Sequence, residues 1–112
     1  MNHARDNVPL LLGRHALGGD ITIDFDTRSR HLHLIGQTGT GKSNLLLNMI
    51  AQDLAHDRGV ALLDPHGDLA EAAIELMPSR RAHHLVYFDP ADAERPIGFN
   101  VLDGVTQDTA PL

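Results

Sequence analysis

Three glycines within six residues, at positions 36, 39 and 41, restrict the fold more than any other feature of the chain. They separate an apolar run, residues 31–35, from an amphipathic run that begins near residue 43. Glycine loses more backbone entropy on folding than any other residue, so a cluster of glycines needs a structural reason. A tight turn is one such reason. The other is a ligand that must approach the backbone more closely than side chains would allow.

The eight residues GQTGTGKS, positions 36–43, fit the P-loop pattern GxxxxGK(S/T), and they lie between a predicted strand and a predicted helix as that pattern requires. The glycines let successive N–H groups converge on one anion, and the following helix adds the positive end of its dipole. We expect Lys42 to reach the β- and γ-phosphates and the Ser43 hydroxyl to bind Mg²⁺. The predicted nucleotide site comprises Gly36, Gln37, Thr38, Gly39, Thr40, Gly41, Lys42, Ser43 and Asn44.

Strand and helix patterns alternate along the chain. Residues 21–25, 31–35, 60–64 and 85–89 have the patterns of strands, and a short strand is possible at 97–101. A helix is predicted from about residue 42, with Gln52 and Asp53 on its polar side and Gly59 after its end. A second helix is predicted to begin at Asp68, the expected N-cap of a capping box with Glu71, and to stop at Pro78. This alternation predicts parallel βαβ units and an α/β sheet.

Composition excludes several classes of protein. The chain has 112 residues, which suits one small domain, and no apolar run is long enough to span a bilayer. It has no cysteine and therefore neither a disulfide framework nor a thiolate metal site. The net charge of −6 and the scattered basic residues provide no basic footprint for nucleic acid. Any contact with DNA must therefore be argued from other features.

Three longer segments carry a resemblance to a family. HLHLIGQTGTGKSNLLLNMIAQDL, GVALLDPHGDLAEAAIELMP and HLVYFDPADAERPIGFNVLDG together resemble the HerA–FtsK superfamily of DNA-pumping P-loop ATPases. The resemblance extends over residues 10–104, and LLGRH before the first strand also looks like this family. The motifs DPHGD, YFDPAD and PIGFN point to the branch of type IV secretion and conjugative coupling proteins.

The resemblance implies a RecA-like P-loop NTPase, a three-layer sandwich with a mostly parallel sheet that is incomplete at its C-terminal side. It divides the chain into an approach segment (1–20), the N-terminal portion of the NTPase domain (21–104) and a truncated tail (105–112). ATP and Mg²⁺ are the implied cofactors. The implied partners are DNA and further copies of the chain in a hexamer-type ring. The implied location is cytoplasmic, or at the inner face of the membrane in a longer parent protein.

Outside the loop the candidate residues have competing interpretations. Asp64 and His66, in DPHG, are candidates for outer-shell roles at the magnesium site or between subunits, but a polar strand end and a turn explain them equally well. The paired histidines at 31/33 and 83/84 fit surface or packed positions better than a metal site, because no metal-ligand spacing supports them. We expect Tyr87 and Phe88 to fill the core.

One departure from the family limits the functional prediction. Neither Asp64 nor Asp89, which end apolar strands, is followed by a glutamate, so no Walker B pair can be placed. We therefore expect the chain alone to be marginally stable and to hydrolyse ATP poorly or not at all. Two alternatives to a DNA-translocating motor remain: a non-catalytic nucleotide-binding or interaction module, and a small-molecule kinase.

Overall fold

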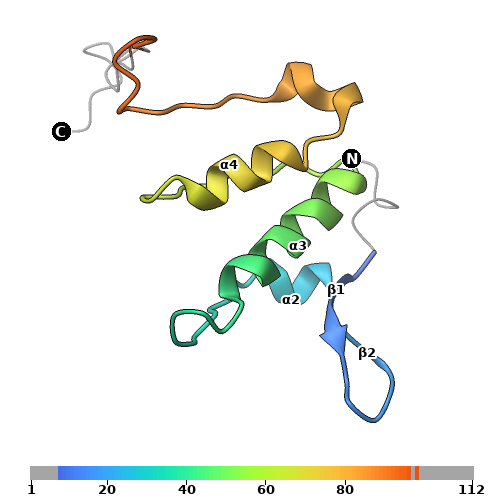
Figure 1. Ribbon diagram of the computed structural model, residues 1–112. Coiled ribbons are helices and arrows are strands. Elements are labelled where there is room, and N and C mark those ends of the chain that lie inside the picture. The colour runs from blue at the N-terminus through green and yellow to red at the C-terminus, as the bar shows by residue number, and fades with distance from the viewer. Residues whose placement is uncertain (1–7, 97, 99–112) are drawn as a thin grey trace, which may run out of the picture.

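The computed structural model describes residues 8–96 and residue 98. A β-hairpin comes first, and helices follow it (Figure 1). The elements are β1 (Leu10–Arg14), β2 (Asp20–Ile23), α2 (Phe25–Arg28), α3 (Lys42–Ala55), α4 (Asp68–Glu75) and the 3₁₀-helix η1 (Ser79–His84).

The hairpin of β1 and β2 is antiparallel, with Leu10 opposite Ile23 and Arg14 opposite Asp20. Its register shifts between Leu11 and Gly13, which places one extra residue in β1 as in a β-bulge. The predicted strand 21–25 is thus partly confirmed, since β2 covers only its first part. It stops because the Asp24 carboxylate caps α2, accepting a hydrogen bond from the backbone N–H of Thr27 at 2.6 Å.

A small apolar core joins the hairpin to α3. Leu10, Ile23 and Met49 are buried together, and Leu12 and Leu45 pack against them. The predicted apolar spacing of the helix accounts for Leu45 and Met49, the two α3 residues of this core, because residues four apart lie on one helix face. Only four apolar residues are buried in the described part of the chain, Leu54 being the fourth. Polar contacts must therefore do much to hold the hairpin and the helices together.

The predicted polar side of α3 provides two of those polar contacts. The Gln52 side chain pairs with the backbone of Leu11 in β1, accepting from its N–H at 2.8 Å and donating to its carbonyl at 2.9 Å. Asp53 is only 6% exposed and is paired with Arg28 and Arg58. These two positions on the polar side of the helix therefore make contacts within the protein.

Both predicted helix boundaries need correction. α3 ends at Ala55, and Asp57 rather than Gly59 takes the left-handed conformation, with φ of 60°. Gly67, not Asp68, is the N-cap of α4, and the capping carboxylate belongs to Asp64 (below). The second helix itself is confirmed, although it ends at Glu75, short of Pro78.

The predicted parallel sheet is absent from the described residues, whose one sheet is the antiparallel hairpin. Segments 31–35, 60–64 and 85–89 are not hydrogen-bonded strands; Figure 1 shows the last of them running extended past α4. The first begins with His31 in a left-handed conformation, φ 78°, at the end of the turn after α2. A strand needs a neighbouring strand, and no strand pairs with these segments among the described residues. Most of their apolar side chains are consequently exposed, with Ile35, Leu63 and Val86 each more than 85% accessible.

Tyr87 and Phe88 do not fill the core as predicted, because their exposed fractions are 43% and 46%. The possible strand at 97–101 and the tail 105–112 lie outside the described residues, apart from residue 98. Among the described helices, none has both the length and the apolar character needed to cross a membrane.

Candidate phosphate-binding loop

The glycine-rich segment forms an exposed loop that leads directly into α3. Gly39 and Gly41 have φ values of 82° and 90°, in the left-handed region that side chains rarely adopt. Gly36 is required for a different reason: a Cβ atom there would lie 2.6 Å from the hydroxyl of Thr40. All three glycines of the motif therefore have a conformational or steric role in this loop.

The side chain of Lys42 folds back over the loop. Its ammonium donates to the carbonyl oxygens of Gly36 and Gln37, both at 2.7 Å. Lysine has three N–H donors, so two of them hold the loop and one remains for an anion. The ammonium is thereby fixed close to the backbone that the pattern assigns to phosphate binding.

The N-terminus of α3 lacks the usual neutralising groups. Its N-cap is Gly41, which has no side chain to accept a hydrogen bond, and its first turn contains no acidic residue. The first N–H groups of a helix have no partner within the helix, and they carry the positive end of its dipole. Lys42, Ser43 and Asn44 supply these N–H groups, and all three residues follow the glycine loop. An anion placed there would find both donors and favourable charge.

α4 offers a direct contrast, because its N-terminus is neutralised by the chain itself. Asp64 accepts from the backbone N–H of Leu69 at 2.8 Å and of Ala70 at 3.1 Å with one oxygen, and from His66 with the other at 3.1 Å. The first turn adds two carboxylates, Asp68 and Glu71. Of the two longer helices, only α3 thus begins with an N-terminus open to an anion.

The hydrogen bonds of Asp64 keep it ionised. The backbone N–H of His66 is the main cause that lowers the pKa of the Asp64 carboxyl; burial opposes the shift, and the N–H groups of Ala70 and Leu69 reinforce it. The DPHG segment therefore has a structural function as the cap of α4. An additional role of Asp64 or His66 near magnesium stays a prediction. No cluster of three potential metal-binding side chains occurs within the described ranges.

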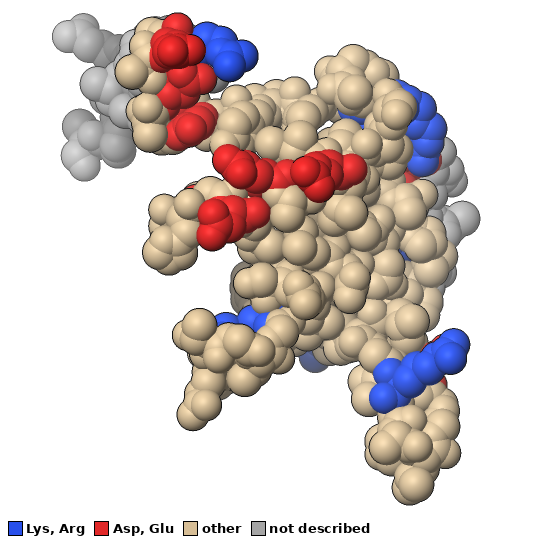
Figure 2. All heavy atoms as spheres, viewed as in Figure 1, with Lys and Arg blue, Asp and Glu red and all other residues tan. Residues whose placement is uncertain are grey.

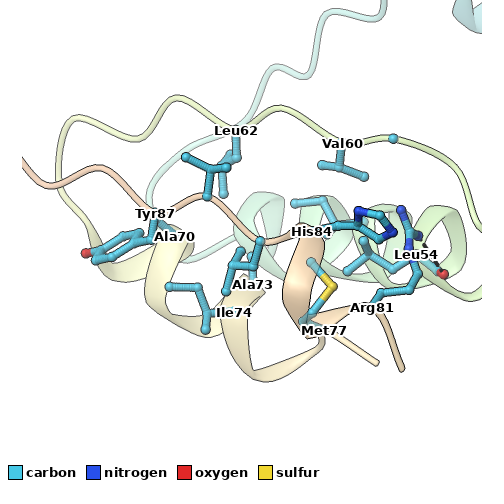
Figure 3. Close-up of a pocket in the computed structure, with 14 residues that line it drawn as sticks. Leu54, Val60, Leu62, Ala70, Ala73, Ile74, Met77, Arg81, His84 and Tyr87 are labelled. Atoms are coloured by element: carbon cyan, nitrogen blue, oxygen red, sulfur yellow. Dashed lines mark hydrogen bonds between the residues drawn. The ribbon is translucent and has the colours of Figure 1, made fainter. Parts of the chain in front are cut away.

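A separate apolar cavity of about 230 Å³ lies between α3, α4 and the extended segments (Figure 3). Leu62 and Ile74 are among its apolar lining residues, and Arg81, His84 and Tyr87 contribute polar groups. None of the residues 36–43 lines it. The cavity is therefore not part of the phosphate-binding loop.

Charge is unevenly distributed over the surface. Figure 2 shows acidic side chains gathered over α4 and over the segment that follows η1. Asp68, Glu71 and Glu75 of α4 are all exposed. Because like charges repel, this face is unsuited to a phosphate-bearing ligand, whereas the first turn of α3 carries no acidic residue.

Three contacts of the loop and its surroundings were missed in the sequence. These are the Thr40–Gln37 hydrogen bond, the Asp64 cap and the buried Asp53 pairs, each made by a polar side chain of a type that is ordinarily exposed. The sequence offered a weak signal for one of the Asp64 bonds, that from the His66 N–H, since Asx side chains commonly bond the backbone two residues on. Nothing in the spacing indicated the pairing of Arg28 with Asp53, which are 25 residues apart.

Comparisons with known proteins support one family. Residues 10–110 match the family model described as "Helicase HerA, central domain". No curated protein matches the chain. No solved structure matches it either. Because the family model covers nearly the whole chain and includes the entire glycine loop, the chain belongs to the family of HerA helicase central domains, within the HerA–FtsK superfamily.

Proposed function

We propose that this chain binds ATP with Mg²⁺ through Gly36–Ser43, as the nucleotide-binding part of a DNA-translocating motor. The observation that carries the proposal is the open N-terminus of α3, where a helix without an N-terminal carboxylate follows a loop with two left-handed glycines. Membership of the HerA family supports a motor ATPase rather than a small-molecule kinase.

In this proposal each part of the loop has one role. The backbone N–H groups of the loop and of the first turn of α3 hold the β-phosphate, and the remaining donor of Lys42 meets the β- and γ-phosphates. The exposed Ser43 hydroxyl, in that first turn, is the ligand that the chain offers to Mg²⁺, with Asp64 as a predicted outer-shell residue. Bound Mg²⁺ would neutralise phosphate charge. Asn44 completes the set of N–H donors.

The wider assembly is part of the same proposal. We propose that copies of the chain, or of a longer protein that contains it, form a hexamer-type ring through which DNA moves, as in the coupling-protein branch suggested by DPHGD and YFDPAD. The acidic face over α4 supports a DNA path that avoids this face (Figure 2).

A non-catalytic nucleotide-binding module is the second candidate. Two observations favour it: no Walker B pair can be placed in the sequence, and the described residues lack the parallel sheet whose strands would carry one. The two candidates share nucleotide binding and differ in turnover.

Titration of the 112-residue chain with Mg·ATP by calorimetry tests the shared step. A hydrogen bond to a charged group contributes about 1.5–3 kcal/mol, so Lys42→Ala should weaken binding roughly tenfold to hundredfold. Arg14→Ala is the matched control, because it removes one positive charge from an exposed position in the hairpin. Equal loss in both variants, or no binding by the unmodified chain, would contradict the proposal.

A hydrolysis assay with and without DNA then separates the candidates. DNA-stimulated turnover that Lys42→Ala abolishes would identify the motor. Lys42-dependent binding without turnover is what both candidates predict for this chain alone, and the same assay on a longer protein that contains the chain would then separate them.

A further inference from the structure

The carbonyl oxygen of Gln37 accepts hydrogen bonds from three donors. The Lys42 ammonium and the Thr40 hydroxyl each lie at 2.7 Å, and the backbone N–H of Thr40 lies at 3.3 Å. A carbonyl oxygen has two lone pairs, so the two short bonds dominate and the long N–H contact is the weakest. The turn between residues 37 and 40 is thus closed chiefly by the Thr40 side chain.

The same hydroxyl also explains why residue 36 must be glycine. A Cβ atom at position 36 would lie 2.6 Å from the Thr40 hydroxyl oxygen, closer than real Cβ contacts come, and 3.6 Å from the Lys42 side chain. The side chains of Thr40 and Lys42 therefore both lie close to the backbone of Gly36. The Lys42 ammonium donates to the carbonyl oxygens of Gly36 and Gln37.

We propose that Thr40 is a positioning residue for Lys42: its hydroxyl orients the Gln37 carbonyl, which in turn holds the ammonium over the loop. This inference deepens the proposed nucleotide-binding function and rests on it for its biological meaning. Without the hydroxyl, the 3.3 Å N–H bond is what remains within the turn to orient the Gln37 carbonyl toward the ammonium. The ammonium then loses one of its two fixed acceptors.

The chain makes a direct test possible, because Lys42 is its only lysine. Acylation of this amine by an amine-reactive reagent, followed by mass spectrometry of the Arg-cleaved peptide 31–58, reports how firmly the ammonium is held in the free protein. Losing one neutral hydrogen bond corresponds to roughly a twofold to tenfold change. Thr40→Val, which removes the hydroxyl at nearly constant shape, should raise the acylation rate by this factor.

Three further variants make the test specific. Thr40→Ser keeps the hydroxyl and should leave the rate within about twofold of the unmodified chain. Gly36→Ala should raise the rate as Thr40→Val does, because the added methyl displaces the hydroxyl. Thr22→Val makes the same chemical change at an exposed position of β2 and should have no effect. An unchanged or slower rate in Thr40→Val, or failure of Thr40→Ser to restore the normal rate, would overturn the inference.

Nucleotide titration of the same variants separates this inference from the proposed function. Thr40→Val should weaken Mg·ATP binding by roughly twofold to tenfold, whereas Thr40→Ser should not. Acylation is measured without nucleotide. If the rates follow the expected order but the unmodified chain does not bind ATP, the positioning of Lys42 by Thr40 stands and the proposed function fails. If ATP binds through Lys42 but the rates are all equal, the proposed function stands and this inference fails.

Discussion

Asp53 and Arg28 are joined by two parallel hydrogen bonds, from Nη1 to Oδ1 at 2.9 Å and from Nη2 to Oδ2 at 2.6 Å. Such two-pronged pairing fixes the relative orientation of both groups as well as their distance. Arg58 donates a third bond to the same carboxylate at 3.1 Å and a further one to the carbonyl of Val8 at 2.8 Å. One carboxylate of α3 therefore ties together α2, the end of α3 and the chain that leads into β1.

Replacing Asp53 should destabilise the chain strongly. Asp53→Asn removes the carboxylate charge that pairs with Arg58, whose side chain is only 9% exposed. Removing one member of a buried pair typically costs about 3 kcal/mol or more. The free energy of unfolding from urea titration is the measurement. Asp20→Asn breaks the exposed pair with Arg14 and should cost about 1 kcal/mol or less. Equal losses in the two variants would show that the Asp53 cluster contributes no more than a surface pair.

Stability should fall at acid pH, and Asp53 should account for part of the loss. Burial alone would raise the pKa of Asp53, but the hydrogen bonds from Arg28 and Arg58 outweigh it and lower the pKa below the ordinary 3.8. A lowered native pKa means that the unfolded chain binds the proton more readily. The contribution is therefore complete well above pH 3.8 and is lost as the pH falls through 3.8 towards the native value. Urea titrations between pH 7 and pH 3 should show a shallower decline in Asp53→Asn, and a parallel decline would contradict this account.

The cap of α4 should depend on Asp64 and not on Asp68. Asp64→Ala removes the acceptor of the Leu69 and Ala70 N–H groups, so these two amides should exchange with deuterium faster. Asp68→Ala removes only a first-turn charge and should change their exchange little. The comparison decides between the capping box that the sequence suggested and the cap in the structure. Faster exchange in Asp68→Ala than in Asp64→Ala would favour the capping box.

The glycine loop and the two helices after it were predictable because their signals are local. Gly39 and Gly41 have left-handed backbone conformations, and the 3.6-residue period of α3 places Leu45 and Met49 on one face. The sheet was not predictable, because an apolar run such as residues 60–64 becomes a strand only when another segment pairs with it. The polar cluster was missed for a similar reason. An aspartate on the polar side of a helix is ordinarily solvated, and only the fold brings Arg28 and Arg58 to Asp53.

The docking of β1 on α3 should depend on the amide of Gln52. Its oxygen and nitrogen bond the N–H and the carbonyl of Leu11, as a neighbouring strand would do. Gln52→Glu keeps the acceptor but loses the donor, whereas Gln52→Met keeps the shape and loses both. The amide nitrogen also donates to the Asn48 carbonyl at 3.1 Å. With about 1 kcal/mol for each neutral hydrogen bond, we expect losses of about 2 kcal/mol for Gln52→Glu and about 3 kcal/mol for Gln52→Met in urea titrations. Asn48→Ala, one turn earlier at an exposed position, serves as the control. If Gln52→Met were as stable as this control, the core of Leu10, Ile23 and Met49 would hold β1 on α3 without help from Gln52.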